Sequence, residues 1–502
     1  MLPDKYHTFH QNIAPFIAPE NIITDPLRTI TYGTDASFYR LVPKIVINVE
    51  NEKEVQLILR EANKLLLSVT FRAAGTSLSG QAITDSILVR LGEGWRSYRV
   101  FDNATRIQLQ PGIIGGHANA ILAEFDKKIG PDPASIDSAK IGGILANNAS
   151  GMCCGVEENS YQTLDSMRLV LSDGTVVDTA EDKSRAEFGR SHGYILEKLS
   201  ILRQKVLEDD QLSERIRYKF KIKNTTGYSL NALVDFEDPY DIMIHLMIGS
   251  EGTLGFISDV VYRTVVEHRH KASALILYPD VKTACQAIPI LQNQPVSAAE
   301  LIDRAGLRSV EDKEGMPDYL QSLGDTVTAL LVETRAETSE ELQSQIDQVH
   351  ESLKELPVER PISFTDVPAE YGGLWKIRKG LFPAVGAVRK TGTTVIIEDV
   401  AFPGEHLAEA ALDLQGLFEK YNYNEAIIFG HALDGNLHFV FTQDFSITSE
   451  VVRYRDFMDE VVNLVVERYD GSLKAEHGTG RNMAPFVQKE WGDAAFNLMR
   501  EI

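Results

Sequence analysis

The sequence predicts an α+β protein with two principal domains, and three observations support this class. A strand, an amphipathic helix and a second strand follow one another over residues 43–71. Glycine-rich loops recur through the first half of the chain. From about residue 270 the pattern changes to strands that alternate with longer helices, which is typical of a second α+β domain. A chain of 502 residues is long enough for two or three domains with separate cores.

The elements of the first half can be assigned in order. The segment PKIVINV (43–49) is predicted as a strand, and a helix follows over 51–66 with Asn51 as its cap and Glu54 three residues on. A strand at 68–71 completes a βαβ unit. Further strands are expected at 106–112 and 248–265, and a hairpin turned on Asp173-Gly174 is expected at 167–179. Helical segments are expected at 115–128 and 181–222.

The second half predicts a βαββαβ sandwich with extensions, a ferredoxin-like arrangement. Its first strand, helix and two further strands are ASALILYP, DVKTACQAIPILQ, SAAELID and VTALLVETR, and the helix SEELQSQIDQVHESLKEL follows. Residues 471–486 are then expected to return as a strand and a glycine turn. No internal repeat is apparent. The proposed domain boundaries are 1–266, 267–470 and 471–502. The chain stops at NLMREI inside an expected helix, which we interpret as a piece of a longer protein.

Composition excludes several functional classes. A net charge of −22 argues against nucleic acid and anionic membrane surfaces as general partners. No stretch approaches the roughly 18 apolar residues of a transmembrane helix, and the N-terminus lacks a signal-peptide pattern. The three cysteines, Cys153, Cys154 and Cys285, form no CxxC pair and indicate neither a disulfide framework nor a cysteine-held cluster. We therefore expect a cytoplasmic protein without a transmembrane segment.

The segment IIFGHALDGNLHFVF (427–441) predicts a hairpin that carries two histidines. Asp434-Gly435 is a strong two-residue turn signal between two apolar strands. A turn centred there makes His431 and His438 direct cross-strand partners, with Cβ atoms roughly 4.5–5.5 Å apart. Two imidazoles that close could share one metal ion. The alternative, that they have no role beyond the hairpin, stays open at this point.

Three loops rich in small residues indicate a long ligand bound through backbone groups. The first, RAAGTSLSGQA (72–82), directly follows a strand, and the others are IGGILANNASG (141–151) and GSEGTLGF (249–256). Successive N–H groups in such a turn form a concave anion site. None of the loops has the GxGxxG spacing of a Rossmann fingerprint. For the first loop alone, a tight loop without a ligand is the alternative.

Together with GPDPAS (130–135), these loops resemble the FAD-binding domain of the vanillyl-alcohol-oxidase and p-cresol-methylhydroxylase (PCMH) superfamily. The nearer likeness is to the FAD-linked D-2-hydroxyacid dehydrogenases, the D-lactate dehydrogenase and glycolate oxidase branch. HALDGNLHF and EHGTGRNMAPF are similar to bacterial D-lactate dehydrogenases that carry a C-terminal iron–sulfur module. The resemblance implies a two-subdomain PCMH-type FAD-binding domain over 1–266, a substrate or cap domain with the histidine hairpin over 267–470, and a return to the flavin site over 471–502.

The resemblance implies non-covalent FAD, because no histidine that could tether the flavin lies between Arg72 and Gln81. Backbone groups of the first loop would hold the pyrophosphate (Arg72, Ala73, Ala74, Gly75, Thr76, Ser77, Ser79 and Gly80), with an ordinary ion pair as the alternative for Arg72. The flavin and ribityl chain would be lined by Pro131, Asp132, Ser135, Gly142, Gly143, Asn147, Ser150, Gly151 and Gly155. The adenine side would be approached by Glu251, Gly252 and Thr253.

The resemblance also implies a metal and two catalytic residues. His431, His438 and Glu476 would bind Zn²⁺, Mn²⁺ or Fe²⁺. His477, on the opposite side of an extended segment from Glu476, would accept the hydroxyl proton. Arg378 would clamp the substrate carboxylate, with plain surface charge as the alternative.

The implied reaction is oxidation of a small D-2-hydroxyacid to the 2-oxoacid by hydride transfer to flavin N5. Phe382 and Ile397 stand where 2-hydroxyglutarate enzymes hold a distal carboxylate, which favours D-lactate. Electrons would pass to a quinone-type acceptor through an iron–sulfur module absent from this chain, and the full-length protein could attach at the inner membrane face. Glycolate or D-2-hydroxyglutarate oxidation, a non-redox transferase like the alkylglycerone-phosphate synthases, and a non-catalytic flavin electron-transfer module are the alternatives.

Overall fold

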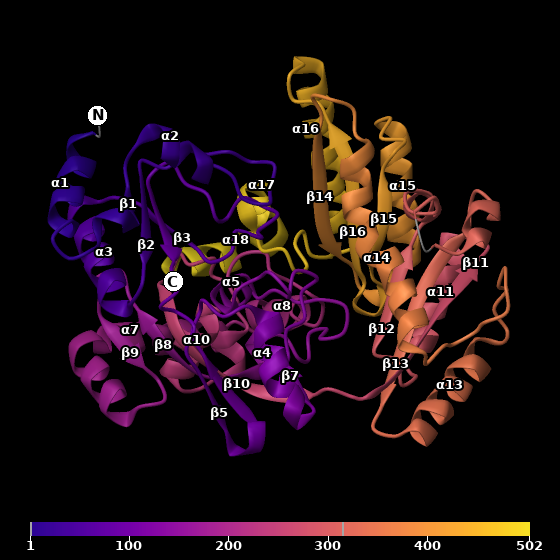
Figure 1. Cartoon of the computed structure of the whole chain (residues 1–502), viewed down its shortest axis with the longest axis horizontal. Helices are drawn as coiled ribbons and strands as arrows, with labels where there is room; N and C mark the ends of the chain where they lie inside the picture. Colours follow the sequence, from indigo (N-terminus) through magenta and orange to yellow (C-terminus); the bar gives the residue numbers. More distant parts are fainter. Residues whose placement is uncertain (1–2, 314–315) are drawn as a thin grey trace.

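Two mixed α/β halves lie side by side in the computed structural model, which describes residues 3–313 and 316–502 (Figure 1). The first half contains two sheets and the second contains one. The chain passes from one half to the other between β10 (Phe256–Val266) and β11 (His270–Tyr278). No described helix is both long and apolar enough to cross a membrane.

The first sheet contains the predicted βαβ unit. Its strand order is β1 (Ile22–Ile23), β2 (Ile45–Val49), β4 (Ile87–Leu91) and β3 (Val69–Arg72), and β4 runs parallel to both β2 and β3. The connecting helix α3 (Glu52–Leu65) begins as expected, because the Asn51 side chain accepts the N–H of Glu54 at 3.2 Å. Since β3 ends at Arg72, the first glycine-rich loop starts at the carboxyl edge of a parallel strand, where ligands commonly bind.

The second sheet is antiparallel and supports the other two glycine-rich loops. Its order is β5 (Tyr98–Phe101), β6 (Arg106–Leu109), β10, β8 (Leu164–Val170) and β9 (Val176–Asp178), and β7 (Lys127–Ile129) pairs with β10. The β8–β9 hairpin turns at Asp173-Gly174 as predicted, with Gly174 at φ +82°. The strand expected from residue 248 begins only at Phe256, because the glycine-rich loop occupies the residues before it.

Helices surround these two sheets. The helix predicted over 115–128 ends earlier, since Asp126 adopts φ +54° and the next residues join β7. Besides α3, the α-helices among the described residues of the first half are α1 (Asp4–Ile13), α2 (Pro26–Thr29), α4 (Gly115–Leu122), α5 (Ile141–Asn147), α6 (Ser160–Thr163), α7 (Asp182–Glu208), α8 (Asp210–Lys219), α9 (Ala232–Asp235) and α10 (Pro239–Met247).

The second half is one antiparallel six-stranded sheet in which the predicted βαββ pattern occurs twice. The first unit is β11, α11 (Val281–Leu291), β12 (Ala298–Ile302), β13 (Thr328–Ala336) and α13 (Ser339–Leu353). The second is β14 (Thr394–Ala401), α15 (Leu407–Lys420), β15 (Ile427–His431), β16 (Asn436–Gln443) and α16 (Thr448–Asn463). The strand order β11-β13-β12-β15-β16-β14 joins the units through β12 and β15. The expectation of no internal repeat therefore missed a structural duplication.

The helices of the second half cover opposite faces of its sheet. Residues of α11, α13, α15 and α16 share one hydrophobic core, whereas α12 (Arg304–Arg308) and α14 (Pro368–Val388) contribute to another together with Ile302, Ala329 and Phe429. The helix α14 is inserted between the two βαββ units and carries Arg378. Its face of the sheet is the one that borders the candidate site.

The C-terminal segment returns to the first half. Of the strand and glycine turn predicted over 471–486, the strand is wrong, since this segment forms one isolated β-bridge, between Ser472 and Ala401. Gly478 and Gly480 do adopt positive φ values, +76° and +60°. The helices α17 (Gly480–Met483) and α18 (Val487–Glu501) follow, and Val487, Trp491 and Leu498 are buried in the core of the first half. Figure 1 shows these helices in yellow among the elements of that half.

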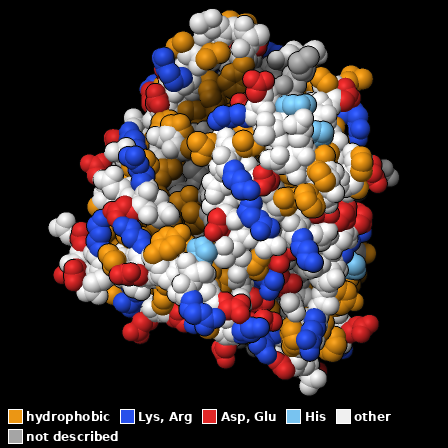
Figure 2. All heavy atoms as spheres, turned by 90° about the vertical axis from the view of Figure 1, so that its left-hand side faces the viewer, with side chains coloured by type: hydrophobic (Ala, Val, Ile, Leu, Met, Phe, Trp, Pro, Cys, Tyr) orange, Lys and Arg blue, Asp and Glu red, His pale blue; other side chains and the backbone are white. Residues whose placement is uncertain are grey.

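Figure 2 views the molecule from the side of the first half. Acidic and basic side chains are interspersed on this face, and a hollow with hydrophobic walls opens in its upper part.

Candidate active site

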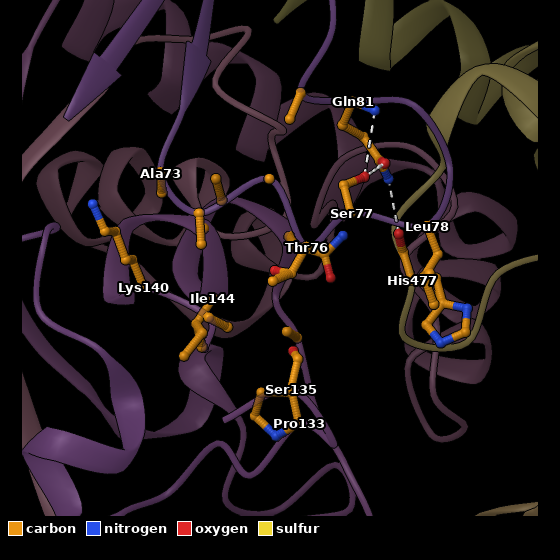
Figure 3. A pocket seen from close by; sticks show the side chains of 18 of the residues that line it. Ala73, Thr76, Ser77, Leu78, Gln81, Pro133, Ser135, Lys140, Ile144 and His477 are labelled. Atoms are coloured by element: carbon orange, nitrogen blue, oxygen red, sulfur yellow. Dashed lines mark hydrogen bonds between the residues drawn. The ribbon is translucent and has the colours of Figure 1, made fainter. Parts of the chain in front are cut away.

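A cavity of about 470 Å³ is bordered by both halves and by the C-terminal segment. Its walls come from the first loop, α5, the loop before β10, helix α14 and the segment around Glu476 and His477. Figure 3 shows Ala73, Lys140 and Ile144 toward one end and Leu78, Gln81 and His477 toward the other. We refer to the latter as the histidine end of the cavity.

The first loop presents unpaired backbone donors to the cavity. Among the described residues, none accepts a hydrogen bond from the N–H groups of residues 74–78. Gly75 has φ +78°, a conformation that a side chain would disfavour. Buried or half-buried N–H groups normally find an acceptor, so a row of free donors on a cavity wall suits an anionic ligand. The residues present therefore fit the pyrophosphate of FAD.

About two thirds of the predicted FAD residues line this cavity, and the others do not. Lining residues are Arg72, Ala73, Ala74, Gly75, Thr76, Ser77, Ser135, Gly142, Gly143, Asn147, Ser150, Glu251 and Gly252. The cavity wall does not include Ser79, Gly80, Pro131, Asp132, Gly151, Gly155 and Thr253. For these seven residues a contact with FAD stays a prediction, and some of them have other contacts in the structure. Asp132, for example, accepts the N–H groups of Cys153 and Cys154 at 3.0 and 3.2 Å and so holds a neighbouring loop.

Arg72 borders the cavity, but its guanidinium group is used elsewhere. Nε donates to the carbonyl of Ala82 at 2.8 Å and Nη2 donates to the carbonyl of Tyr32 at 3.0 Å. The first bond joins the two ends of the first loop, and the second fixes the loop to Tyr32. The buried side chain therefore braces the loop, and a contact of Arg72 with the pyrophosphate stays a prediction.

Glu251 lies at the histidine end, although the family resemblance implied a place on the adenine side. Its Oε1 accepts from Asn147 Nδ2 at 2.9 Å and from Gln81 Nε2 at 3.3 Å, and Gln81 Nε2 also donates to the carbonyl of His477 at 2.8 Å (Figure 3). Burial raises the pKa of Glu251 to about 8, because a buried carboxylate is poorly solvated. The carboxyl group therefore stays protonated near neutral pH.

The predicted histidine hairpin forms, but with a different register. His438 is the cross-strand partner of Phe429 and not of His431, because the turn contains an extra helical turn at Ala432–Asp434 before Gly435. The offset is two residues, so both imidazoles still project from the same face of the sheet. His431 Nε2 and His438 Nε2 lie 3.3 Å apart.

Glu476 completes a compact triangle of donor atoms with these histidines. Its Oε1 lies 3.1 Å from His431 Nε2 and 3.4 Å from His438 Nε2. In a tetrahedral site with bonds of roughly 2.0–2.1 Å, ligand atoms are separated by roughly 3.3 Å. The three atoms therefore fit one coordination sphere, with positions left for substrate or water. His438 and Glu476 border the cavity, while His431 lies behind them.

A second grouping, of Asp399, His438, Glu476 and His477, has donor atoms within 4.8 Å of one another. Asp399 is less suited to be a ligand, since Oδ2 accepts the N–H groups of Glu476 and His477 at 2.6 and 2.9 Å. Its Oδ1 accepts from Asn436 at 2.7 Å. We therefore assign Asp399 as a residue that holds the segment 476–477 against the sheet.

His477 borders the cavity beside the triangle. Its ring stacks on that of His438 with centroids 5.0 Å apart, and its Nδ1 is buried without a hydrogen-bond partner among the described residues. Burial outweighs the neighbouring carboxylates and lowers the pKa of His477 to about 4. The imidazole is therefore neutral at physiological pH and able to accept a proton.

Glu300 connects the His431–His438–Glu476 triangle with Arg378. Oε1 lies 2.6 Å from His431 Nδ1, and Oε2 accepts from Arg378 Nε at 2.5 Å. Although burial opposes it, the cationic groups of His431 and Arg378 lower the pKa of Glu300 to about 2. Among the described residues, no partner is present for the two Nη groups of Arg378, which borders the cavity. A guanidinium group with two free Nη groups can bind both oxygens of a carboxylate.

Sequence analysis missed the charged residues around this centre. Glu300 and Asp399 lie in strands β12 and β14, and Lys223 and Lys474 lie in irregular segments, with Lys474 Nζ 2.9 Å from Glu398 Oε2. The detectable signal was an acidic residue inside an otherwise apolar strand, as in AAELI and VIIEDVA. Charged residues are almost never fully buried unless they are paired.

Two family descriptions match the chain. Residues 43–180 match a FAD binding domain, and residues 267–502 match the C-terminal domain of FAD linked oxidases. Residues between and before these ranges belong to the same two halves of the fold.

Individual relatives agree with these matches. The chain is 24% identical to D-2-hydroxyglutarate dehydrogenase of Pantoea ananatis, over 94% of this chain and 48% of that protein. It is 26% identical to the mitochondrial D-lactate dehydrogenase [cytochrome] of Arabidopsis thaliana, over 97% of this chain and 76% of that one. The chain thus spans about half the length of the first of these relatives.

The fold is also similar to that of p-cresol methylhydroxylase with substrate bound, with a TM-score of 0.69, 12% sequence identity, and coverage of 99% of this chain and 93% of that one. This likeness concerns the fold alone. The cavity with free backbone donors, the two matched domains and the relatives lead to one conclusion. The chain combines the FAD binding domain and the C-terminal domain of the FAD linked oxidases in a PCMH-type fold.

Proposed function

We propose that this chain oxidises a small D-2-hydroxyacid, with D-lactate favoured, to the corresponding 2-oxoacid. The observation that carries the proposal is the convergence of Arg378, His477 and the His431–His438–Glu476 triangle at one end of the cavity. Bound FAD would supply the two-electron acceptor for the C2 hydride. A divalent metal on the triangle would supply a Lewis acid that lowers the pKa of the substrate hydroxyl.

The chain's own side chains would orient the substrate and move its proton. The free Nη groups of Arg378 would bind the substrate carboxylate, and its Nε bond to Glu300 fixes the guanidinium plane. His477 would take the hydroxyl proton, since its lowered pKa keeps the ring neutral. Its carbonyl bond to Gln81 holds this residue at the wall of the cavity.

The walls near Arg378 favour a short apolar substrate tail. Phe382, Ile397 and Phe429 border the cavity, so the methyl group of lactate would contact hydrocarbon and aromatic surface. One observation favours D-2-hydroxyglutarate as the second candidate: Lys379 borders the same cavity and could pair with a second carboxylate. Glycolate, which has no tail, remains an alternative.

The reduced cofactor must pass its electrons on, and we propose an iron–sulfur or quinone-type carrier outside residues 1–502 as the acceptor. The functional boundaries that we propose are 1–266 for FAD, 267–470 for substrate and metal, and 471–502 for the segment that closes the site. Cys153, Cys154 and Cys285 are all free thiols, which supports a reducing cytoplasmic location.

Anaerobic reduction of the bound flavin tests the proposal. FAD-loaded protein is mixed with D-lactate, L-lactate, glycolate or D-2-hydroxyglutarate, and the loss of flavin absorbance is followed before and after chelation. We expect D-lactate to bleach the flavin fastest and chelation to abolish this, with recovery on adding Zn²⁺ or Mn²⁺. Preferential bleaching by D-2-hydroxyglutarate would support the second candidate. No bleaching by any of the four acids would overturn the dehydrogenase assignment.

A further inference from the structure

Lys223 is a buried cation next to the proposed metal centre, and it has no part in the proposed reaction. It lies in the irregular segment after α8, and its side chain is only 1% exposed. Three acceptors surround Nζ: Gly151 O at 2.8 Å, Glu476 Oε2 at 3.0 Å and Asp434 Oδ2 at 3.2 Å. An ammonium group has three donor hydrogens, so this arrangement satisfies it fully.

The three acceptors come from three separate parts of the site. Gly151 is the last residue of a glycine-rich loop of the first half, Asp434 lies in the turn between the two histidine strands, and Glu476 belongs to the C-terminal segment. One side chain thus connects the flavin half, the histidine hairpin and the carboxylate of the triangle. The Asp-Gly turn signal in the sequence did not predict this ion pair of Asp434 with Lys223.

Lys223 also decides which oxygen of Glu476 faces the histidines. Oε2 is engaged by Lys223 and by Ser150 Oγ, at 3.0 and 3.3 Å, so Oε1 alone is directed to His431 and His438. A carboxylate held in this way can offer one oxygen to a metal. Without the ammonium group, Glu476 would be free to rotate and its charge would be uncompensated in a buried site.

The neighbouring residues hold the same segment in place through hydrogen bonds. Thr225 N donates to the carbonyl of Lys474 at 2.7 Å, and Gly478 N donates to Thr225 Oγ1 at 3.0 Å. The segment 223–226 therefore lies alongside residues 474–478, and Lys223 is its only charged member. This placement brings the ammonium group within reach of Glu476.

We infer that Lys223 is a positioning residue of the metal centre: it fixes Glu476 as a one-oxygen ligand and, through Asp434, sets the histidine hairpin against the flavin half. This inference rests on the proposed function, because it assumes that His431, His438 and Glu476 bind a divalent metal. It concerns metal affinity and requires no proton transfer by Lys223.

The test measures the Kd of Zn²⁺ for the FAD-loaded chain by competition with a chromophoric chelator, with flavin content as a second readout. We expect Lys223→Met to weaken Zn²⁺ binding by about 10- to 100-fold, as is typical when a partner of a metal ligand is removed. Lys223→Arg should restore part of the affinity. Flavin content should stay unchanged, because Lys223 does not border the cavity.

Lys219→Met is the matched control. Lys219 is also fully buried, pairs with Glu490 at 3.0 Å, and donates to the carbonyl of Gly471 in the same C-terminal segment, but it contacts no residue of the triangle. We expect this variant to lose thermal stability while its Zn²⁺ Kd stays within about 2-fold of the wild-type value. Equal losses of affinity in both variants would overturn the inference, since they would reflect a general loosening of the segment.

A double substitution separates positioning from general destabilisation. In a Glu476→Gln background, Lys223→Met should cause a smaller loss of Zn²⁺ affinity than in the wild type, because the part of its effect that acts through that carboxylate is already absent. An additive loss would overturn the inference. If Lys223→Met does not fold, Asp434→Asn takes its place, with an expected loss of about 3- to 10-fold. Wild-type affinity in that variant would equally overturn it.

Zn²⁺ binding by the wild-type chain and by His431→Ala separates a failure of the proposed metal centre from a failure of the role of Lys223. If both bind Zn²⁺ equally well, or neither binds it, the proposed metal centre fails and the role of Lys223 fails with it. If the wild type binds through the histidines while Lys223→Met binds as tightly, only the role of Lys223 is overturned.

Discussion

Glu300 and His431 are direct cross-strand partners in β12 and β15, and the carboxylate Oε1 lies 2.6 Å from the imidazole Nδ1. The second histidine has a matching neighbour, because His438 pairs across β14 and β16 with Asp399. Each imidazole of the triangle thus has an acidic residue on the adjacent strand. Carboxylates in this position orient a metal-binding imidazole and increase its basicity.

Glu300→Gln should therefore weaken metal binding while leaving the FAD content unchanged. The amide keeps the shape of the side chain but loses the charge that orients His431, and we expect Zn²⁺ affinity to fall by about 10-fold. Equilibrium titration with a competing chelator measures this. Glu333→Gln is the control, since Glu333 is a buried carboxylate in the neighbouring strand that bonds Trp375 and Arg335 instead. Wild-type affinity in Glu300→Gln would contradict the assigned role.

Arg378→Lys should raise the KM for the hydroxyacid. A lysine keeps the positive charge but loses the two-point fork, and loss of one charge-assisted hydrogen bond of about 1.5–3 kcal/mol corresponds to roughly 10- to 100-fold. Steady-state kinetics with an artificial electron acceptor would show the change, while flavin absorbance confirms cofactor loading. Lys376→Met, an exposed position on the same helix, should behave as the wild type. A KM unaffected by Arg378→Lys would return this residue to a structural role.

Gly478→Ala should disturb the histidine end of the cavity. A Cβ at this position would overlap Glu251 Oε1 and Asn147 Nδ2, and the residue has φ +76°, so the backbone would also be strained. We expect a loss of about 1–3 kcal/mol in the free energy of unfolding and weaker flavin retention. Urea unfolding and flavin fluorescence measure these two effects.

Gly416→Ala should stabilise the folded protein, in contrast to Gly478→Ala. This glycine lies inside helix α15, and, apart from its chain neighbours and the backbone of its own helix, no described atom lies within 4 Å of an added Cβ. The substitution should increase the free energy of unfolding by about 0.5–1 kcal/mol, because alanine favours the helix. If both glycine variants shifted stability in the same direction, local geometry would not be the cause.

His245 should make stability fall in acid. The ring stacks on Phe236 with centroids 3.8 Å apart, and its Nδ1 lies 2.7 Å from the carbonyl of Asp241. Burial lowers the pKa of His245 from 6.5 to about 4. Between these two pH values the unfolded state binds a proton at His245 more readily than the folded state does. The stabilisation by the neutral ring is therefore complete above about pH 6.5, and about 3 kcal/mol of the free energy of unfolding is lost as the pH falls toward 4.

His245→Phe removes this titration and should flatten the pH dependence. The variant has a constant penalty for the lost hydrogen bond, but the gap in unfolding free energy between wild type and variant should narrow or reverse as the pH is lowered. Urea unfolding at about pH 7 and about pH 4.5 provides the comparison. Parallel profiles would show that His245 does not titrate on unfolding.

Much of the local structure could be predicted because short-range rules determine it. The cap of α3 at Asn51 needs only Glu54 three residues away, and the β8–β9 turn needs only Asp173-Gly174. The same rules placed His431 and His438 on one face of a hairpin. They failed on its register, because a helical turn before Gly435 shifted the pairing by two residues.

The sequence by itself determined the class of the fold, the glycine-rich loop after β3 and the histidine pair of the hairpin, since these depend on residue identity and local spacing. Glu476 was predicted only through the family resemblance. Only the tertiary structure decided which oxygen of Glu476 faces the imidazoles, where the guanidinium of Arg72 points, and that Glu300 and Lys223 lie beside the centre. Those contacts join residues far apart in the chain. A buried charge is tolerated only beside its partner, and strand order and loop path determine which partner it meets.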